Sequence, residues 1–342
     1  MQDRPEELSQ RLSRRMALKL GLGAGALAAI DQFTGHPIES LFATELAAVP
    51  VQAGATIMRA IPSSGELLPV IGMGTARNYE DPGPDQIPPL REVIKAFPQM
   101  GGKVLDTAPS YGRAETVVGD LMKELKNRDK YFVATKVSLG GRGGRGGGGD
   151  APPPGADAAN ASLARSLERF GTTQLDLMQI WNLSQPDVLH PLLEEWKAAK
   201  KIRYTGITTS SDGQYGNLET IVSTKKFDFL QIDFAIDNRN AQDRILPMAR
   251  DKGIAVLINL PFGRGRPFQK VAGKPLPGWA KDIDCTDWSQ VFLKYIVSHP
   301  AVTAVIPGTE KTEFLALNIA AGKGRLPDAA MRKRIETEFD AL

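Results

Sequence analysis

Short apolar runs alternate with longer amphipathic stretches along most of this chain. Eight runs rich in Val, Ile and Leu follow one another, at residues 69–75, 103–108, 131–138, 175–181, 202–208, 228–234, 254–260 and 302–307. Between them, stretches such as 114–125 and 189–200 carry apolar residues at helical spacing, and Leu192, Leu193 and Trp196 form one stripe in the second. Strands that alternate with helices are typical of βα units around a parallel sheet. Eight such units predict a closed barrel.

Asp106, Tyr111 and Lys136 place a carboxylate, a phenol and an amine in two of the strand-like segments. Together these groups can deliver a proton to a carbonyl oxygen. A free phenol has a pKa of about 10, so a tyrosine acts as an acid near neutral pH only if positive charge nearby stabilises its phenolate. We expect Lys136 to supply that charge and Asp106 to hold the ammonium group in place.

The segment 106–112, DTAPSYG, resembles the aldo/keto reductase family together with Glu115, Gly119 and the Thr-Lys pair at 135–136. Further segments resemble the successive strand ends of that family, in order: GELLPVIGMGTA (65–76), LDLMQIWN (175–182), KIRYTGITTS (201–210), LQIDFAID (230–237), INLPFGRG (258–265) and HPAVTAVIPGT (299–309). The agreement extends from residue 56 to about residue 326.

The resemblance implies an α/β fold, a single-domain (β/α)8 TIM barrel over residues 56–342. It also implies an oxidoreductase that binds NADP, with NAD as the alternative, and reduces a small aldehyde or ketone. Tyr111 would be the proton donor, assisted by Lys136 and Asp106. The length of 342 residues is compatible, because α/β barrels of about 250 residues commonly form one domain. Reacting residues of such barrels lie at the carboxyl ends of the strands, where these three residues fall.

Cofactor contacts are also implied by the resemblance. Thr208, Thr209 and Gln231 match the Ser-Asn pair and the Gln that hold the nicotinamide carboxamide in the family. Asn259 stands at the position of the aromatic residue that stacks on the nicotinamide, and Phe262 would substitute for it if its loop bends inward. The remaining matches are Gly74 and Thr75 at the first strand end, Gly263, Arg264, Gly308, Thr309 and Lys311 for the phosphates, and Asn318 for the adenine.

The preference between NADPH and NADH depends on positive charge near the last strand. Family members often have Lys and Arg there to meet the 2′-phosphate, whereas this chain has Gly308 and Phe314 at those positions. Arg264 and Lys311 are the remaining candidates.

Trp181 is the largest departure from the family pattern. The family has a histidine after the segment LDLMQI, and this histidine orients the carbonyl; here Trp181 and then Asn182 follow. The indole either lines the substrate pocket and donates one N–H, or packs to close the mouth of the barrel. Of the other histidines beyond the N-terminal segment, His190 is expected to be solvated or near a helix start, and His299 to be structural.

Two functions of different classes remain open. The first is an NAD(P)H-dependent carbonyl reductase, which the combination of Asp106, Tyr111 and Lys136 favours. The second is a cofactor-binding, reductase-like protein with little turnover that serves sensing or partner binding, which Trp181 and Asn259 favour.

The amino terminus resembles a twin-arginine export signal. Ser13, Arg14 and Arg15 precede an apolar, glycine-rich run at residues 20–30 that is shorter than the roughly 20 residues of a membrane span. We therefore expect a signal peptide at residues 1–30, a linker at 31–55, the twin-arginine export machinery as a partner, and a periplasmic location. A dispensable or membrane-surface helix is the alternative.

A glycine-rich run at residues 141–146 has the spacing G-x-G-x-x-G but is followed by three prolines at 152–154 instead of a helix. A dinucleotide fingerprint needs that helix, so we interpret the run as a mobile loop near the mouth of the barrel. Arg142 or Arg145 would there meet a cofactor phosphate or an acidic substrate.

Charge and cysteine content exclude other classes. The net charge of +3 at pH 7 without a clustered basic stripe argues against binding to nucleic acid. The single cysteine, Cys285, cannot form a disulfide within the chain and is expected to be an incidental surface or loop thiol.

Overall fold

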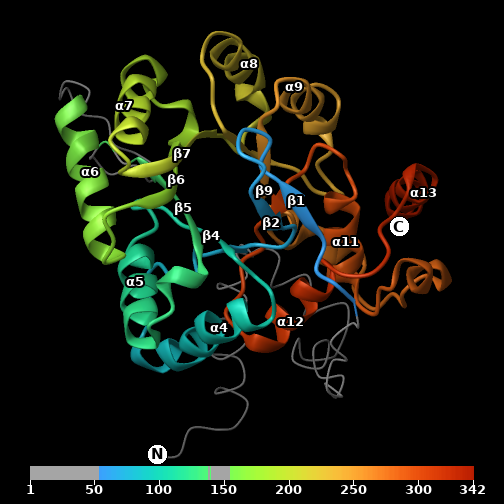
Figure 1. Cartoon of the computed structure of the whole chain (residues 1–342). Coiled ribbons are helices and arrows are strands. Elements are labelled where there is room, and N and C mark those ends of the chain that lie inside the picture. Colours follow the sequence, from blue (N-terminus) through green and yellow to red (C-terminus); the bar gives the residue numbers. More distant parts are fainter. Residues whose placement is uncertain (1–53, 138, 140–154) are drawn as a thin grey trace, which may run out of the picture.

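The computed structural model describes residues 54–137, 139 and 155–342. Eight parallel strands form one sheet, in the order β10-β9-β8-β7-β6-β5-β4-β3 (Figure 1). Their bounds are β3 (Met73–Gly74), β4 (Val104–Asp106), β5 (Phe132–Val137), β6 (Leu175–Ile180), β7 (Ile202–Thr208), β8 (Phe229–Asp233), β9 (Ala255–Asn259) and β10 (Ala304–Val305). Each strand lies within one of the eight apolar runs, as predicted.

The first and last strands of this sheet meet and close it. Bridges pair Ile71 with Val305 and Gly74 with Gly308. A Cβ on Gly74 would lie 2.9 Å from the carbonyl oxygen of Ile306, so only glycine allows this approach. The predicted (β/α)8 barrel is therefore confirmed.

Helices surround the barrel (Figure 1). The predicted helix at 114–125 is α5 (Ala114–Leu125), and the one at 189–200 is α7 (Pro186–Ala198), which starts three residues earlier. The other helices are α4 (Ile87–Gln99), α6 (Ala156–Arg169), α8 (Tyr215–Thr224), α9 (Ile245–Asp251), α10 (Arg266–Lys270), α11 (Trp288–Val297), α12 (Thr312–Ala320) and α13 (Ala329–Asp340). Short 3-10 turns are η1 (Pro84–Gln86), η2 (Arg128–Lys130), η3 (Trp181–Leu183), η4 (Asp212–Gln214), η5 (Asn240–Gln242), η6 (Gly263–Gly265) and η7 (Gly278–Ile283).

Side chains of the strands alternate between the barrel interior and the layer of helices. On β5, Phe132 and Ala134 pack in the interior cluster, whereas Val133 and Val137 pack in the cluster beneath the helices. Successive side chains of a strand point to opposite faces. The same alternation places Lys136 on the interior side, near the carboxyl end of its strand.

An antiparallel hairpin of β1 (Met58–Ala60) and β2 (Leu67–Pro69) precedes the barrel. Ile61 and Leu68 of this hairpin are fully buried in the interior cluster, so the hairpin covers the amino-terminal end of the barrel. The sequence did not predict this element, because its strands of three residues are too short for a periodic pattern.

Cys285 lies in the turn between η7 and α11, and its thiol is buried. The expectation of a surface thiol was therefore wrong, although the loop position was right. Burial raises the pKa of this thiol to about 12, so Cys285 behaves as a small apolar side chain.

Several predictions fall on residues that the structure does not describe. These are the signal peptide at 1–30, all but the last two residues of the linker, and the glycine-rich loop with Arg142 and Arg145. In the part of the chain that is described, no helix has both the length and the apolar character that crossing a bilayer requires.

Positive charge gathers at the carboxyl end of α11. Arg59 of β1 donates hydrogen bonds to the carbonyl oxygens of Val297 (2.6 Å) and His299 (2.8 Å), and Arg332 donates to Ser298 Oγ (2.7 Å). Cations stabilise a helix carboxyl end, where backbone carbonyls carry partial negative charge. Burial and, to a smaller extent, the same cations lower the pKa of the His299 imidazole to about 4. His299 is thus a neutral packing residue, in keeping with the structural role expected for it.

We expect His299 to make the protein less stable in acid. Its pKa is depressed in the folded chain, so the unfolded chain binds the proton more readily between pH 6.5 and about 4. Stability is then fully present above pH 6.5 and is lost as the pH falls toward 4. His299→Asn should reduce the slope of the unfolding free energy against pH in this window. The reduction should correspond to at most about one proton taken up on unfolding. Urea unfolding at a series of pH values measures the slope, with His190→Asn as control; equal slopes in parent and His299→Asn would contradict the expectation.

Candidate active site

Polar side chains occupy the carboxyl-terminal end of the barrel interior. Asp106 is the last residue of β4, Lys136 is the fifth residue of β5, and Gln231 lies in β8. All three are buried. The interior below them is apolar, with Val104, Phe132 and other members of the interior cluster. Strand alternation therefore brings together an acid, an amine and an amide that are far apart in the sequence.

Asp106 and Lys136 form a buried ion pair. Lys136 Nζ donates to Asp106 Oδ1 at 2.8 Å, to Asp106 Oδ2 at 2.9 Å and to the carbonyl oxygen of Thr107 at 2.8 Å. These acceptors use all three N–H groups of an ammonium. Burial alone would lower the pKa of Lys136, but the charge and hydrogen bonds of Asp106, together with the nearby Tyr111, raise it above its usual value. The amine is thus held in its charged form, as expected from the sequence.

Tyr111 lies in the turn after β4, where its backbone N–H donates to the carbonyl oxygen of Ala108 at 3.0 Å. The Lys136 ammonium lies 5.1 Å from the centre of its ring. Burial raises the pKa of the Tyr111 phenol, and the opposing effect of Lys136 is the smaller one. Lys136 is the cation expected beside the phenol, but burial has the larger effect on the pKa of Tyr111. Tyr111 therefore remains protonated at neutral pH, which is the form that donates a proton.

Glu115 of α5 ties the strand of Lys136 to two helices. Its carboxylate accepts hydrogen bonds from Thr135 Oγ1 (2.6 Å), Ser166 Oγ (3.0 Å) and Arg169 Nη1 (2.7 Å). Thr135 points out of the barrel, opposite to its neighbour Lys136. These hydrogen bonds to Glu115 hold β5 on the side that faces the helices, and the ion pair holds it on the side that faces the barrel interior.

Trp181 begins η3, directly after β6, and is partly buried. Its indole N–H has no hydrogen-bond partner among the described residues, and the side chain does not pack in either core cluster. Asn182, Leu183 and Gln185 all have positive φ angles, of 48°, 55° and 44°. Such conformations are costly for residues other than glycine and are often found at functional sites. Trp181 therefore stands on a strained loop at the mouth of the barrel.

The positions that the resemblance assigned to nicotinamide lie at neighbouring strand ends. Thr208 and Thr209 follow one another at the end of β7, and both are buried. Asn259 ends β9, and its Nδ2 donates to the carbonyl oxygen of Thr209 at 3.3 Å, while its Oδ1 is buried without a partner in the described chain. Gln231 is buried as well, and its amide contacts Asp106 at 3.4 Å.

Phe262 does not turn toward these residues. Its ring packs against Phe268 with centroids 5.0 Å apart, and Phe268 in turn packs against Phe292 of α11 at 5.4 Å. These contacts belong to the layer of helices. The suggestion that Phe262 replaces the missing aromatic residue at Asn259 is therefore wrong, because its loop directs the ring outward.

The other cofactor positions lie at the end of β3 and in the segments that follow β9 and β10. Thr75 Oγ1 donates to the backbone oxygen of Asp106 at 3.1 Å, beside Gly74. Arg264 follows Gly263 in η6 and is exposed. After β10, Gly308 is exposed, and the hydroxyl of Thr309 donates to the carbonyl oxygen of Lys311. Lys311 directly precedes α12, and Asn318 is buried within α12.

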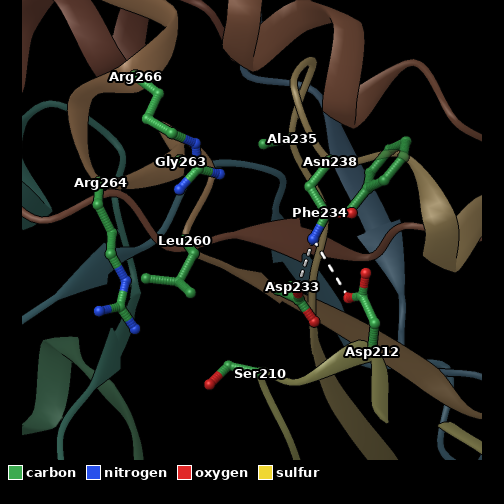
Figure 2. Close-up of a pocket in the computed structure, with 10 residues that line it drawn as sticks. All are labelled: Ser210, Asp212, Asp233, Phe234, Ala235, Asn238, Leu260, Gly263, Arg264 and Arg266. Carbon is green, nitrogen blue, oxygen red and sulfur yellow. Dashed lines mark hydrogen bonds between the residues drawn. The ribbon is translucent and has the colours of Figure 1, made fainter.

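A pocket of about 170 Å³ opens beside these strand ends (Figure 2). Its walls come from the loops after β7, β8 and β9, including Ser210, Leu260 and Arg264. Asn238 Nδ2 donates to Asp233 Oδ2 at 2.7 Å and to Asp212 Oδ1 at 3.3 Å, as the dashed lines show. Burial raises the pKa of the Asp233 carboxyl. Carboxylates thus line one wall, and arginine lies across the pocket from them.

Asp212, Asp233 and Asn238 were not identified from the sequence. The only available signal was position, because Asp212 follows the Thr-Thr-Ser-Ser segment and Asp233 is two residues after Gln231. Within the described residues, no group of three or more His, Cys, Asp or Glu side chains could hold a metal ion.

The two histidines lie away from this site. His190 Nε2 lies 2.8 Å from the carbonyl oxygen of Lys226, and its ring packs edge-on against Phe227 at 4.9 Å. His299 lies at the end of α11, as described above. Neither of them takes the place of a histidine at Trp181.

Comparison with known proteins gives a consistent result. The model of the aldo/keto reductase family matches residues 70–336. Aldo-keto reductase YhdN of Bacillus subtilis is 29% identical over 185 residues, which are 51% of this chain and 52% of that protein. The chain thus matches about half the length of this relative. The NADH-specific methylglyoxal reductase of Escherichia coli is 26% identical over 279 residues, 70% of this chain and 84% of that protein.

The fold has counterparts among solved structures. An aldo/keto reductase from Klebsiella pneumoniae in complex with NADP and acetate superposes with a TM-score of 0.65 at 22% identity, covering 80% of this chain and 93% of that one. At this level of identity the likeness concerns the fold. The match of the family model over residues 70–336 shows that this chain belongs to the aldo/keto reductase family.

Proposed function

We propose that the protein is an NAD(P)H-dependent oxidoreductase that reduces an aldehyde or ketone, with Tyr111 as the proton donor. The observation that carries the proposal is the buried Asp106–Lys136 ion pair, with its ammonium 5.1 Å from the ring of Tyr111. A protein that only binds a cofactor has no physical need for a buried ion pair next to a phenol. Membership of the family and the relatives named above support the same activity.

The residues at the strand ends fit a nicotinamide cofactor in two respects. Asn259 Oδ1 is a buried acceptor without a donor, next to Thr208 and Thr209, and a carboxamide N–H would satisfy it. Arg264 is exposed, forms no ion pair within the described chain, and lies at the rim of the pocket, where it is available to a phosphate. NADP is the proposed cofactor, and NAD is the alternative.

The reaction requires one proton and one hydride at a carbonyl group. When bound, the reduced nicotinamide supplies the hydride to the carbonyl carbon. Tyr111 gives its phenolic proton to the carbonyl oxygen, so that the product is an alcohol and the phenol becomes a phenolate. Lys136 stabilises that phenolate because its ammonium is already charged and needs no reorganisation. Asp106 keeps the ammonium in place, and solvent then returns a proton to Tyr111.

The choice between the two cofactors would fall on few side chains. Phe314 is exposed on the first turn of α12, at a position where family members often carry a cation, and Lys311 Nζ lies 5.8 Å from its ring centre. Lys311 and Arg264 are the cations available to a 2′-phosphate. Competition between NADPH and NADH in a binding assay would show which of the two cofactors binds more tightly.

A reductase-like protein with little turnover is the second candidate. Trp181 favours it, because an indole has no acceptor and its one N–H is at the ring edge. Asn259 favours it too, since it cannot stack on a nicotinamide as an aromatic side chain would.

The export route is part of the proposal. Arg14 and Arg15, followed by the apolar run at 20–30, support export by the twin-arginine machinery to the periplasm. This route carries folded proteins, so NAD(P)H would be loaded before transport. The absence of any need for a disulfide is compatible with folding in the cytoplasm.

Tyr111→Phe should lower kcat for carbonyl reduction by about 10²- to 10⁴-fold, the usual contribution of a general acid. Cofactor affinity should stay within a few fold, because the hydroxyl acts on the transition state. Steady-state kinetics and cofactor fluorescence measure the two quantities. Tyr204→Phe, at the opposite end of the barrel, is the matched control and should retain activity. Full activity of Tyr111→Phe would remove this residue from the mechanism.

Trp181→His distinguishes a degraded reductase from a specialised one. If the site is degraded, the added donor should increase kcat/KM for small generic aldehydes, by about 2 to 4 kcal/mol of transition-state stabilisation at most. If Trp181 shapes a specialised pocket, the variant should be less active on the native substrate, and generic aldehydes should remain poor substrates. A panel of carbonyl compounds measures both, with Trp288→His as the control. A variant equal to the parent on the whole panel would contradict both versions.

Replacing Arg14 and Arg15 with Lys should leave the protein in the cytoplasm. The proposed export signal depends on the arginine pair and not on positive charge alone, because guanidinium and ammonium groups are recognised differently. Fractionation of cells that express the parent and the double variant measures the location. Unchanged recovery from the periplasm would indicate another route.

A further inference from the structure

The glutamine at position 179, on β6, lies in the same buried layer as the ion pair. Its Nε2 donates to Gln231 Oε1 at 2.8 Å and to Asp106 Oδ1 at 3.5 Å, and Gln231 Nε2 donates to Asp106 Oδ2 at 3.4 Å. Gln179, Gln231 and Asp106 thus form a closed ring of three side chains from β6, β8 and β4. Lys136 completes the surroundings of Asp106, so each carboxylate oxygen accepts one ammonium N–H and one amide N–H.

Gly206 provides the space in which Gln179 crosses the barrel. β7 lies between β6 and β8, and its Gly206 is the direct neighbour of Gln179 in the sheet. A Cβ on Gly206 would lie 2.8 Å from Gln179 Cγ, closer than real Cβ contacts come. Gly206 has no positive φ, so the backbone does not require glycine there. The missing Cβ therefore accommodates the side chain of Gln179 at the shortest distance, with Leu177 Cδ1 at 3.1 Å and the carbonyl oxygen of Phe229 at 3.3 Å.

The orientation of both amides fits an ionised Asp106. A carboxylate only accepts hydrogen bonds, whereas a protonated carboxyl group must also donate one. Both glutamines turn their NH₂ groups toward Asp106, and Gln179 leaves its Oε1 buried without a partner among the described residues. If the Gln179 amide were rotated, its Oε1 would face Asp106 Oδ1 and Gln231 Oε1, which are both acceptors. The two long contacts thus act mainly as oriented dipoles.

The surroundings of the carboxylate oppose its burial. Burial raises the pKa of Asp106, and Lys136, Gln231 and Gln179 each act against that rise. Without the amide dipoles, Asp106 would take a proton at higher pH, and a neutral Asp106 no longer holds the ammonium of Lys136. The phenol of Tyr111 would then lose the cation that stabilises its conjugate base.

We infer that Gln179, with the space that Gly206 provides, is a positioning residue that keeps Asp106 ionised and thereby keeps the Lys136 ammonium beside Tyr111. This inference rests on the proposed carbonyl reduction for its kinetic consequence. Its structural part, the charge of Asp106, can be measured without turnover.

Two variants remove the interaction in different ways. Gln179→Met keeps the length of the side chain but removes both the donor and the unpaired acceptor, so the variant should fold. Gly206→Ala keeps the glutamine but displaces it through the added Cβ. Gln290→Met, another buried glutamine, and Gly216→Ala, which has nothing within 4 Å of the added Cβ, are the matched controls. Circular dichroism and thermal unfolding check that each variant is folded.

The first readout is the titration of Asp106 by carbon-13 NMR in protein with labelled aspartate carboxyl groups. The Asp106→Asn variant identifies the signal. In Gln179→Met and in Gly206→Ala the signal should titrate at higher pH than in the parent, by about half a pH unit or more, and the controls should match the parent. An unchanged titration in the folded variants would overturn the inference, whether or not the protein reduces carbonyls.

The second readout is the pH profile of carbonyl reduction. In both variants kcat should fall roughly tenfold, a part of the contribution of general acid catalysis, and the acid limb of kcat/KM should move to higher pH. The affinity for NADPH should stay within about threefold. A loss that saturating NADPH restores would overturn the inference, since Gln179 would then act through cofactor binding. If the parent has no turnover but the NMR shift occurs, the proposed function fails and the positioning role of Gln179 stands.

Discussion

The buried ion pair between Asp106 and Lys136 determines how the carboxyl end of this barrel is built. Two charges inside a protein lose hydration worth several kcal/mol each, so they persist only when paired and fully hydrogen-bonded. The carbonyl oxygen of Thr107 and the amides of Gln179 and Gln231 complete that bonding. Removing one partner would leave an uncompensated buried charge. The polar layer is therefore one unit, and its ammonium lies 5.1 Å from the centre of the Tyr111 ring.

The two ends of the barrel differ in character: apolar packing contacts lie at the amino-terminal end, and polar groups lie at the carboxyl-terminal end. At the amino-terminal end, the β1–β2 hairpin inserts Ile61 and Leu68 into the apolar interior, and Arg59 binds the last turn of α11. The ion pair lies at the carboxyl-terminal end, where the strained residues after Trp181 and the polar pocket near Arg264 also follow the strands. Backbone strain and unpaired buried acceptors are costly, and such features are concentrated at functional sites. Asn182, Leu183 and Gln185, with positive φ angles, and the unpaired Oδ1 of Asn259 lie at the end that the ion pair occupies, whereas Lys126 and Lys200 have positive φ angles before β5 and β7.

The sequence predicted the architecture well because the barrel repeats one simple pattern. Each buried strand needs an uninterrupted apolar run, and each helix needs an apolar stripe, so all eight strands and α5 could be located. The hairpin was missed because strands of three residues leave no periodicity. Cys285 was misjudged because its polar neighbours, Asp284 and Thr286, suggested exposure, whereas the turn after η7 directs the thiol inward. Local composition does not determine the direction of a side chain in a turn.

For the site, the sequence by itself determined which residues face the interior. The alternation of strand residues places Asp106, Lys136 and Gln231 on one side, at the carboxyl ends where reacting groups lie. Only the tertiary structure decided which of them meet. The contact of Gln179 with Gln231 joins residues 52 positions apart, across a strand on which Gly206 leaves space. Likewise, burial decided the direction of the pKa shift of the phenol. Both depend on closure of the barrel, because closure sets the distances across its interior and excludes water from it.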